Sequence, residues 1–393
     1  MKDPLYDLRA VYQDRHARAL DWKRSGRRVF GYFCDNIPEE LLMAADILPV
    51  RVSGDPRRGR AAYARYVEPL GPFYEGRFDY VASMIEGLLS GEYDYLDGLV
   101  VPHTRKAIQQ IYGQLLLIKE QHPALRLPEL FFLDRTYTSS YSSALFNRRQ
   151  IVAFRTALEK FVGHAISNDA IIAAIRLTNE ARRLLRSLSD LRTASPTRCS
   201  GVDALHIIGA SMLMPKASFV ELLREFLAAS GTEPVIPPRV RVFIGGSPFD
   251  HPQLYELIEA AGAVVVAEDH CWGARCGDFP VTEGIDPIEA LAARYTDKPA
   301  CSIALPLRRT VDLSVARALA ARADAAIFLV QRGDELQLWE TPDEVRALEA
   351  TGMPVLHRAR QPYAVTDSDR FAEEIGSFLA KVASAAQATE VHR

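Results

Sequence analysis

The sequence predicts an α/β protein in which a helical section separates two doubly wound parallel-sheet lobes. The chain has 393 residues, which is too long for one ordinary hydrophobic core. Short apolar runs alternate with helical patterns in two separate stretches, as is typical of parallel sheets covered by helices. We therefore expect a helical lead-in over 1–28, a first α/β lobe over 29–146, a helical section over 147–233 and a second α/β lobe over 234–393.

Each element of the first lobe has a local signal. The expected strands are 28–33, 48–52, 99–101 and 130–133, and the run at 99–101 is bounded by Asp97-Gly98 and Pro102. The expected helices begin near Pro38, at residue 80 and at residue 105. A proline directly before a helical pattern suits the first turn of a helix.

The pattern changes to long amphipathic helices after the first lobe. Between residues 147 and 192, isoleucines and leucines recur at helical spacing with charges between them, and a further helical stretch runs to Ser230. Residues 234–238 are expected to form a linker, because they begin and end with proline. The second lobe then has expected strands at 241–244, 263–267, 325–330 and 354–357, and expected helices at 253–261 and 369–382.

Composition and charge exclude several classes of protein. Hydrophobic residues make up 48% and charged residues 25%, which are ordinary globular values. A net charge of −3 gives no reason to expect nucleic acid or an anionic membrane as partner. No apolar run approaches the ~20 residues that span a bilayer, and no signal peptide is visible, so we expect a cytoplasmic protein. The five cysteines are too scattered for a disulfide framework.

Candidate site residues follow from the rule that ligands of doubly wound sheets lie at the carboxyl ends of the strands. His103 and Thr104 follow one strand, where they are candidates to bond a substrate carbonyl, although Thr104 is also suited to cap the next helix. Ser247 follows two glycines, where backbone N–H groups often meet an anion. Glu268, at the end of a later strand, is a candidate for proton transfer or for capping a turn.

Several longer stretches resemble one enzyme family. They are GYFCDNIPEELLMAADILPVRVSG (31–54), YDYLDGLVVPHTRKAIQQIYGQL (93–115), NEAR (179–182) and RVRVFIGGSPFDHPQLYELIEAAGAVVVAEDHCWGAR (239–275). In this order and spacing they resemble the large-subunit family of 2-hydroxyacyl-CoA dehydratases and benzoyl-CoA reductases, of the 2-hydroxyglutaryl-CoA dehydratase D-component type. The resemblance spans nearly the whole chain.

The resemblance implies partners and a cofactor. In the family two homologous subunits pair, an acyl-CoA thioester binds near a 4Fe-4S cluster, and a separate ATP-dependent activator protein delivers one electron. The outcome is dehydration, a lyase reaction, or reduction of an aromatic ring, an oxidoreductase reaction, and the sequence leaves both open. The chain has no G-x-x-x-x-G-K-[ST] segment, so ATP would be used by a partner.

The resemblance also implies three cysteine thiolates on each subunit, and their expected positions hold Gly71 or Pro72, Arg105 and Gly333. Thiolates hold such clusters by bonding directly to iron, whereas arginine is a permanent cation. We therefore expect a clusterless partner subunit, with the cluster on its homologue and with no cluster or a non-standard one on this chain. Arg105 then becomes a candidate for binding a substrate phosphate or carboxylate.

Two alternatives stay open. In one, Cys34, Cys271 and Cys276 form a rearranged iron–sulfur site in a catalytic subunit, although the spacing of the last two matches no common zinc or ferredoxin signature. Cysteines at such places are also typical small apolar packing residues. In the other, the chain is a clusterless acyl-CoA-binding or regulatory protein.

Overall fold

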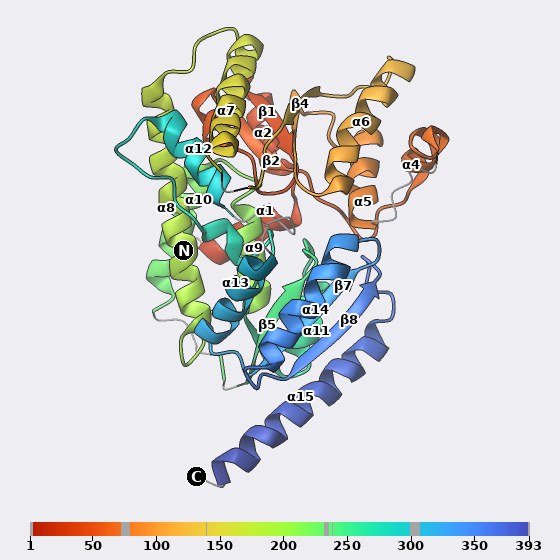
Figure 1. The fold of residues 1–393 in the computed structure, drawn as a ribbon, viewed down its shortest axis with the longest axis vertical. Helices are drawn as coiled ribbons and strands as arrows, with labels where there is room; N and C mark the ends of the chain where they lie inside the picture. Colours follow the sequence, from red (N-terminus) through yellow and green to blue (C-terminus); the bar gives the residue numbers. More distant parts are fainter. Residues whose placement is uncertain are drawn as a thin grey trace.

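A computed structural model of the chain describes residues 3–71, 79–138, 140–231, 236–237, 239–298 and 307–391. Two four-stranded parallel sheets form two lobes, seen at the top and the bottom of Figure 1, and long helices pack along one side of both. This arrangement confirms the predicted fold class. Within the described residues, no helix is both long enough and apolar enough to cross a membrane.

The two sheets have the same strand order. The first runs β2-β1-β3-β4 and the second β6-β5-β7-β8. Their bounds are β1 Arg28–Tyr32, β2 Ile47–Arg51, β3 Gly98–Pro102, β4 Glu129–Leu133, β5 Val240–Gly246, β6 Ala263–Glu268, β7 Ala325–Gln331 and β8 Val355–Gln361. In each sheet the chain reverses its direction of winding at the first strand. The loops after β1 and β3, and those after β5 and β7, therefore flank a topological switch point, where such sheets bind ligands.

Fifteen α-helices surround the sheets in the described part of the chain. In the lead-in and first lobe they are α1 Pro4–Gln13, α2 Ala17–Arg24, α3 Glu39–Ala44, α4 Ala61–Tyr66, α5 Asp79–Leu89 and α6 Lys106–Gln121. The helical section holds α7 Tyr141–Val162, α8 Asn168–Thr193, α9 Gly201–Ala210 and α10 Lys216–Ala229. The second lobe has α11 Gln253–Ala260, α12 Pro287–Asp297, α13 Leu307–Ala320, α14 Glu335–Glu349 and α15 Ser368–Val391.

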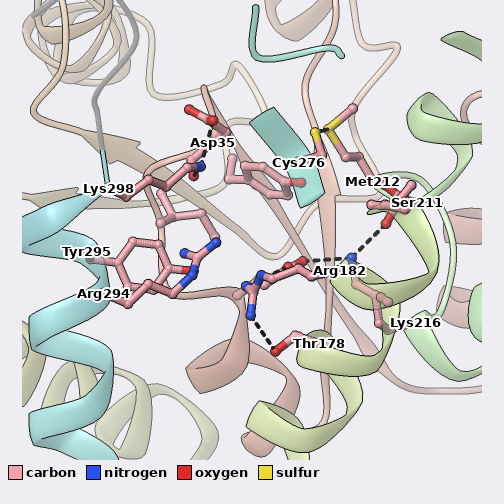
Figure 2. Close-up of a pocket in the computed structure, with 15 residues that line it drawn as sticks. Asp35, Thr178, Arg182, Ser211, Met212, Lys216, Cys276, Arg294, Tyr295 and Lys298 are labelled. Carbon is pink, nitrogen blue, oxygen red and sulfur yellow. Dashed lines mark hydrogen bonds and ion pairs between the residues drawn. The ribbon is translucent and has the colours of Figure 1, made fainter. Parts of the chain in front are cut away.

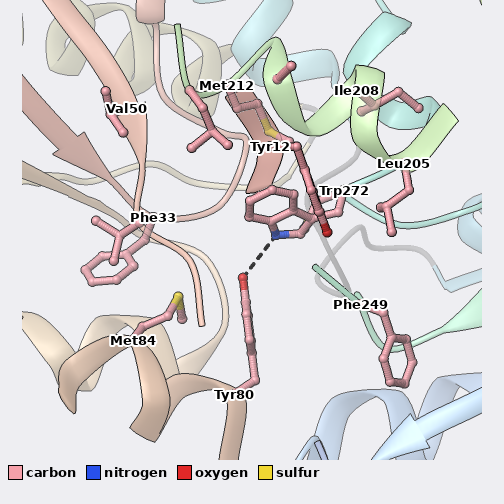
Figure 3. Packing of buried hydrophobic residues seen from close by; sticks show 14 of the residues in the cluster. Tyr12, Phe33, Val50, Tyr80, Met84, Leu205, Ile208, Met212, Phe249 and Trp272 are labelled. Atoms are coloured by element: carbon pink, nitrogen blue, oxygen red, sulfur yellow. Dashed lines mark hydrogen bonds between the residues drawn. The ribbon is translucent and has the colours of Figure 1, made fainter. Parts of the chain in front are cut away.

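One apolar core extends through both lobes. Its central residue is Trp272, which is fully buried and whose indole N–H donates to the Tyr80 hydroxyl at 3.1 Å. Phe33 and Met84 of the first lobe lie on one side of this pair, and Phe249 of the second lobe lies on the other (Figure 3). Because the burial of large side chains supplies most of the free energy of folding, the two lobes stabilise each other.

Helix α8 is tied to each lobe by a buried ion pair. Arg182 contacts Glu40 of α3 in the first lobe at 2.7 Å. Roughly 15 Å further along the helix axis, Arg192 donates to Glu268 at the end of β6 in the second lobe at 3.0 Å. The helical section therefore braces the two lobes as well as separating them in the sequence.

Candidate functional site

The two switch points face each other across the junction between the lobes. In the first lobe, the Cys34 sulfur lies 3.4 Å from the Thr104 hydroxyl. In the second lobe, the Ser247 hydroxyl donates to the Asp334 carboxylate at 2.7 Å. The Arg105 guanidinium joins the two sides by contacting the other oxygen of Asp334 at 2.7 Å. The Arg105–Asp334 ion pair is thus the polar centre of the junction.

This centre is closed to solvent. The side chains of Arg105 and Asp334 are 5% and 2% exposed. Ser247 is completely buried and accepts the Gln331 backbone N–H at 2.9 Å. Gly246 brings the chain to this position with a φ of 98°, and a Cβ there would lie 2.2 Å from the Leu329 carbonyl oxygen, so only glycine fits.

A pocket of about 500 Å³, including its open mouth, lies nearby between the first lobe, α8 and α12. Its lining is rich in buried charge, and Figure 2 shows Lys298 beside Asp35 and Arg182 beside Thr178. The Lys298 ammonium contacts the Asp35 carboxylate at 2.6 Å, and Lys216 contacts Glu39 at 2.9 Å. The cations that line it are Arg182, Lys216, Arg294 and Lys298, and the carboxylates are Asp35 and Glu39.

Comparison with known proteins identifies the family. The family described as "2-hydroxyglutaryl-CoA dehydratase, D-component" matches residues 34–379, which is most of the chain. The chain belongs to this family. The family predicted from the sequence motifs is therefore confirmed.

The relatives of this D-component family member are subunits of dehydratases and reductases. It is 26% identical to a benzoyl-CoA reductase subunit of Thauera aromatica over 311 residues, which cover 74% of the chain and 77% of the relative. It is 21% identical to the (R)-phenyllactyl-CoA dehydratase beta subunit of Clostridium sporogenes over 84% of the chain and 86% of the relative. It is 22% identical to the beta subunit of (R)-2-hydroxyglutaryl-CoA dehydratase of Acidaminococcus fermentans, with 70% of each covered.

The family's expected thiolate positions do not fit a thiolate-bound cluster in this chain. One position is Arg105 and another is Gly333, and Arg105 forms a buried ion pair with Asp334, the residue after Gly333. Gly71 ends the short 3₁₀ helix Glu68–Leu70 with a φ of 94°, and Pro72 lies outside the described residues. A permanent cation that a carboxylate already neutralises offers no bond to iron.

The three cysteines predicted as alternative ligands are not brought together as a set. The Cys271 sulfur accepts from Arg51 at 2.8 Å, and the Cys276 thiol donates to the Cys271 carbonyl at 3.5 Å, whereas Cys34 contacts Thr104. Burial raises the pKa of Cys276 to about 11, which disfavours its thiolate. Among the residues that the structure describes, no three His, Cys, Asp or Glu side chains form a group that could hold a metal ion.

His103 follows β3 at the carboxyl edge of the first sheet. Its Nδ1 contacts the Asp134 carboxylate after β4, and its ring stacks on Phe132. The alternative prediction that Thr104 caps the following helix is wrong, because the N-cap residue of α6 is Arg105. Thr104 is buried against Cys34, so only His103 of this pair is open to solvent.

Glu268 lies inside the second lobe as a structural carboxylate. Burial raises its pKa, but the Arg192 guanidinium, with smaller effects of His270 and the Ala274 N–H, lowers it more, so the net shift is downward. Its Oε1 also accepts the Ala274 backbone N–H at 2.9 Å, and Gly273 packs directly against its side chain. A role for Glu268 in proton transfer stays a prediction that this geometry does not favour, because a general acid or base must reach its substrate.

Most of the charged pocket lay outside the sequence predictions, which named only Cys276 among its lining residues. Two signals point to it in retrospect. Asp35 follows Cys34 directly after β1, at the predicted edge. Asp286 caps α12 by accepting the Ile288 and Glu289 N–H groups, with Pro287 at the first helical position. That capping pattern marks the helix that carries Arg294 and Tyr295.

Proposed function

We propose that this chain is a clusterless partner subunit of a 2-hydroxyacyl-CoA dehydratase or benzoyl-CoA reductase-like complex. It pairs with a homologous subunit that bears the 4Fe-4S cluster and closes one side of the acyl-CoA cavity. An ATP-dependent activator protein delivers the electron to that cluster. The observation that carries the proposal is the buried ion pair between Arg105, at one expected ligand position, and Asp334, next to another.

The ion pair supports the loss of a cluster on physical grounds. Desolvating a guanidinium is costly, and a close counter-charge offsets that cost. Asp334 supplies that charge, and Ser247 holds the carboxylate in place with a second hydrogen bond. The charges and hydrogen-bonding groups of Arg105, Asp334 and Ser247 are therefore matched without a metal ion. In this proposal a buried polar contact between the lobes takes the place of a cysteine ligand.

The pairing is supported by the relatives, which are named as subunits of dehydratases and reductases. In such a complex this chain supplies shape and excludes water rather than carrying electrons. His103, at the solvent-accessible end of the edge, remains our candidate for contact with the acyl-CoA, whereas Thr104, Arg105 and Ser247 are held in buried contacts.

The test is iron and acid-labile sulfide content after anaerobic purification, on this chain alone and together with a cluster-bearing homologue. We expect an iron-free, folded chain on its own, and a complex of both subunits that carries about four irons. The homologue purified alone is the matched control for cluster loss during handling.

Two outcomes would overturn the proposal. About four irons on the chain alone would make it a catalytic subunit, and loss of that iron in C271S would assign a rearranged cysteine set. A chain that stays monomeric beside its homologue would favour the regulatory alternative, which calorimetry with a CoA thioester then tests directly.

A further inference from the structure

The guanidinium of Arg135 is buried and has no hydrogen-bond partner among the described residues. It follows β4 at the carboxyl edge of the first sheet and is 4% exposed. None of its three guanidinium nitrogens has a hydrogen-bond partner among the described residues, and its guanidinium carbon lies 4.7 Å from the centre of the Tyr137 ring. Buried polar groups in folded proteins are nearly always hydrogen-bonded, and a guanidinium carries five donors. Arg135 is therefore poised for a partner that the described chain does not supply.

Arg294 of α12 is a second buried arginine, and part of its guanidinium has no hydrogen-bond partner among the described residues. It is 7% exposed, and its Nε donates to the Phe279 carbonyl at 2.6 Å. Its Nη1 is buried and has no hydrogen-bond partner in the described ranges. Arg294 lines the charged pocket, next to Tyr295 and Lys298 in Figure 2.

The two arginines belong to one electrostatic neighbourhood. Burial lowers the pKa of Arg135, Tyr137 and Asp35 act against this effect, and Arg294 lowers the pKa further by like-charge repulsion. Asp35 uses its Oδ2 to bind Lys298, and its Oδ1 has no hydrogen-bond partner among the residues described. Asn147 donates both to the Thr136 carbonyl, next to Arg135, at 3.0 Å and to the Thr296 hydroxyl of α12 at 3.1 Å, so the loop after β4 lies against the helix that carries Arg294.

The surrounding cations are already neutralised. Arg182 is paired with Glu40, Lys216 with Glu39, and Lys298 with Asp35. Arg135 and Arg294 have no carboxylate at ion-pair distance in the part of the chain that the structure describes. Two positive charges thus remain without a counter-charge where the effective dielectric constant is low, which favours an anion entering from solution.

We propose that Arg135 and Arg294 form a binding site for an oxyanion, a carboxylate or a phosphate, beside the charged pocket that Arg294 lines. Guanidinium groups match the two oxygens of such anions with paired N–H donors. The pocket also has an apolar wall of Ile37, Leu185 and Met212, which suits a short apolar stem attached to the anion. The site is separate from the Arg105–Asp334 pair and does not rest on the proposed subunit pairing.

The test is isothermal titration calorimetry on the full chain in an oxyanion-free chloride buffer, with glutarate and inorganic phosphate as separate probes. We expect saturable binding of at least one, and the tighter probe tells whether the site takes a carboxylate or a phosphate. R135M and R294M should each weaken binding by about tenfold or more, as for loss of one partner in a buried charged contact. R308Q is the matched control, because Arg308 is 88% exposed on α13.

A thermal measurement separates binding from a structural role. Without ligand, R135M should melt no lower than the wild type, because it removes a buried charge that has no partner. The bound probe should raise the melting temperature of the wild type but not of R135M. No saturable heat and no thermal shift with either probe on the folded wild type would overturn the proposal, as would unchanged binding in R135M and R294M. A drop in the ligand-free melting temperature of R135M would instead assign a structural arginine.

Discussion

At the scale of single residues, a buried ion pair forms the polar centre of the molecule. Arg105 stands at an expected ligand position and forms an ion pair with Asp334, the neighbour of a second such position. A buried ion pair contributes little net stability, because desolvation offsets the attraction, but each charge becomes costly once its partner is removed. The pair therefore fixes the two side chains to each other more than it stabilises the fold.

This asymmetry gives the first prediction. R105M leaves the Asp334 carboxylate buried without a cation and should lower the free energy of unfolding by about 3–5 kcal/mol. The double variant R105M/D334L removes both charges and should return close to the wild-type value. Urea denaturation of the wild type, both single variants and the double variant checks this. Additive losses in the double variant would mean that the two side chains do not act as a pair.

Glu344 gives a prediction about pH. It is buried in α14, and burial, followed by the nearby Asp269 charge, raises the pKa of its carboxyl from 4.5 to about 7. The folded protein therefore holds a proton that the unfolded chain releases. The stability from this group is complete below pH 4.5 and is lost as the pH rises to about 7, by roughly 3 kcal/mol in all.

The measurement compares wild type with E344Q from pH 4.5 to pH 8 by urea denaturation. Relative to the wild type, E344Q should gain stability across this range, because glutamine mimics the protonated carboxyl at every pH. E349Q on the exposed side of the same helix is the control and should leave the pH dependence unchanged. A constant difference between wild type and E344Q at every pH would refute the shifted pKa.

At the scale of elements, the strands were predicted closely and the later helices were not. The apolar runs at 99–101 and 325–330 became β3 and β7 with ends that differ by one residue, because buried strands are short and are bounded by turn residues. Helix α14 went unpredicted, since Pro342 lies inside it and interrupts the helical pattern. The lead-in predicted as one helix is two, because the first helix ends at Asp14.

Of the residues in the candidate site, the sequence predicted only those that follow the carboxyl end of a strand. The carboxyl-edge rule found Cys34, Arg105 and Ser247, and the structure brings these edges together. The same rule applied to the end of β4 would have reached Arg135. It does not reach Arg294, which lies on a helix, and no spacing in the sequence relates these two arginines. Only the folded chain places them in one neighbourhood.

Helix α8 carries the third prediction. R192M should destabilise the protein by about 3–5 kcal/mol, because Glu268 then stays buried without its cation, and R192M/E268L should recover most of the loss. R183M, at an exposed position of the same helix, is the control. The assay is chemical denaturation of all four proteins. If E268Q instead kept full stability and lost only catalytic activity in the assembled complex, Glu268 would be catalytic and not structural.

At the scale of the whole molecule, the two lobes share one apolar core. Trp272 of the second lobe bonds Tyr80 of the first within a continuous apolar core, and α8 is tied to both lobes by buried pairs. Separating the lobes would expose much of this core to water at a cost that no single ion pair matches. The Arg105–Asp334 pair lies at this junction, where the shared core and α8 hold the two lobes together.

The last prediction follows from the apolar core that the two lobes share. Scanning calorimetry of the wild type should show a single unfolding transition, with calorimetric and van't Hoff enthalpies that agree. R105M/D334L should still show one transition, because the apolar core and not the ion pair couples the lobes. W272A removes the central side chain of that core, so it should lower stability by about 3–5 kcal/mol and is the variant expected to broaden the transition. Two resolved transitions in the wild type would mean that each lobe folds on its own. In that case the lobes would be able to move about their junction, where the Arg105–Asp334 pair lies.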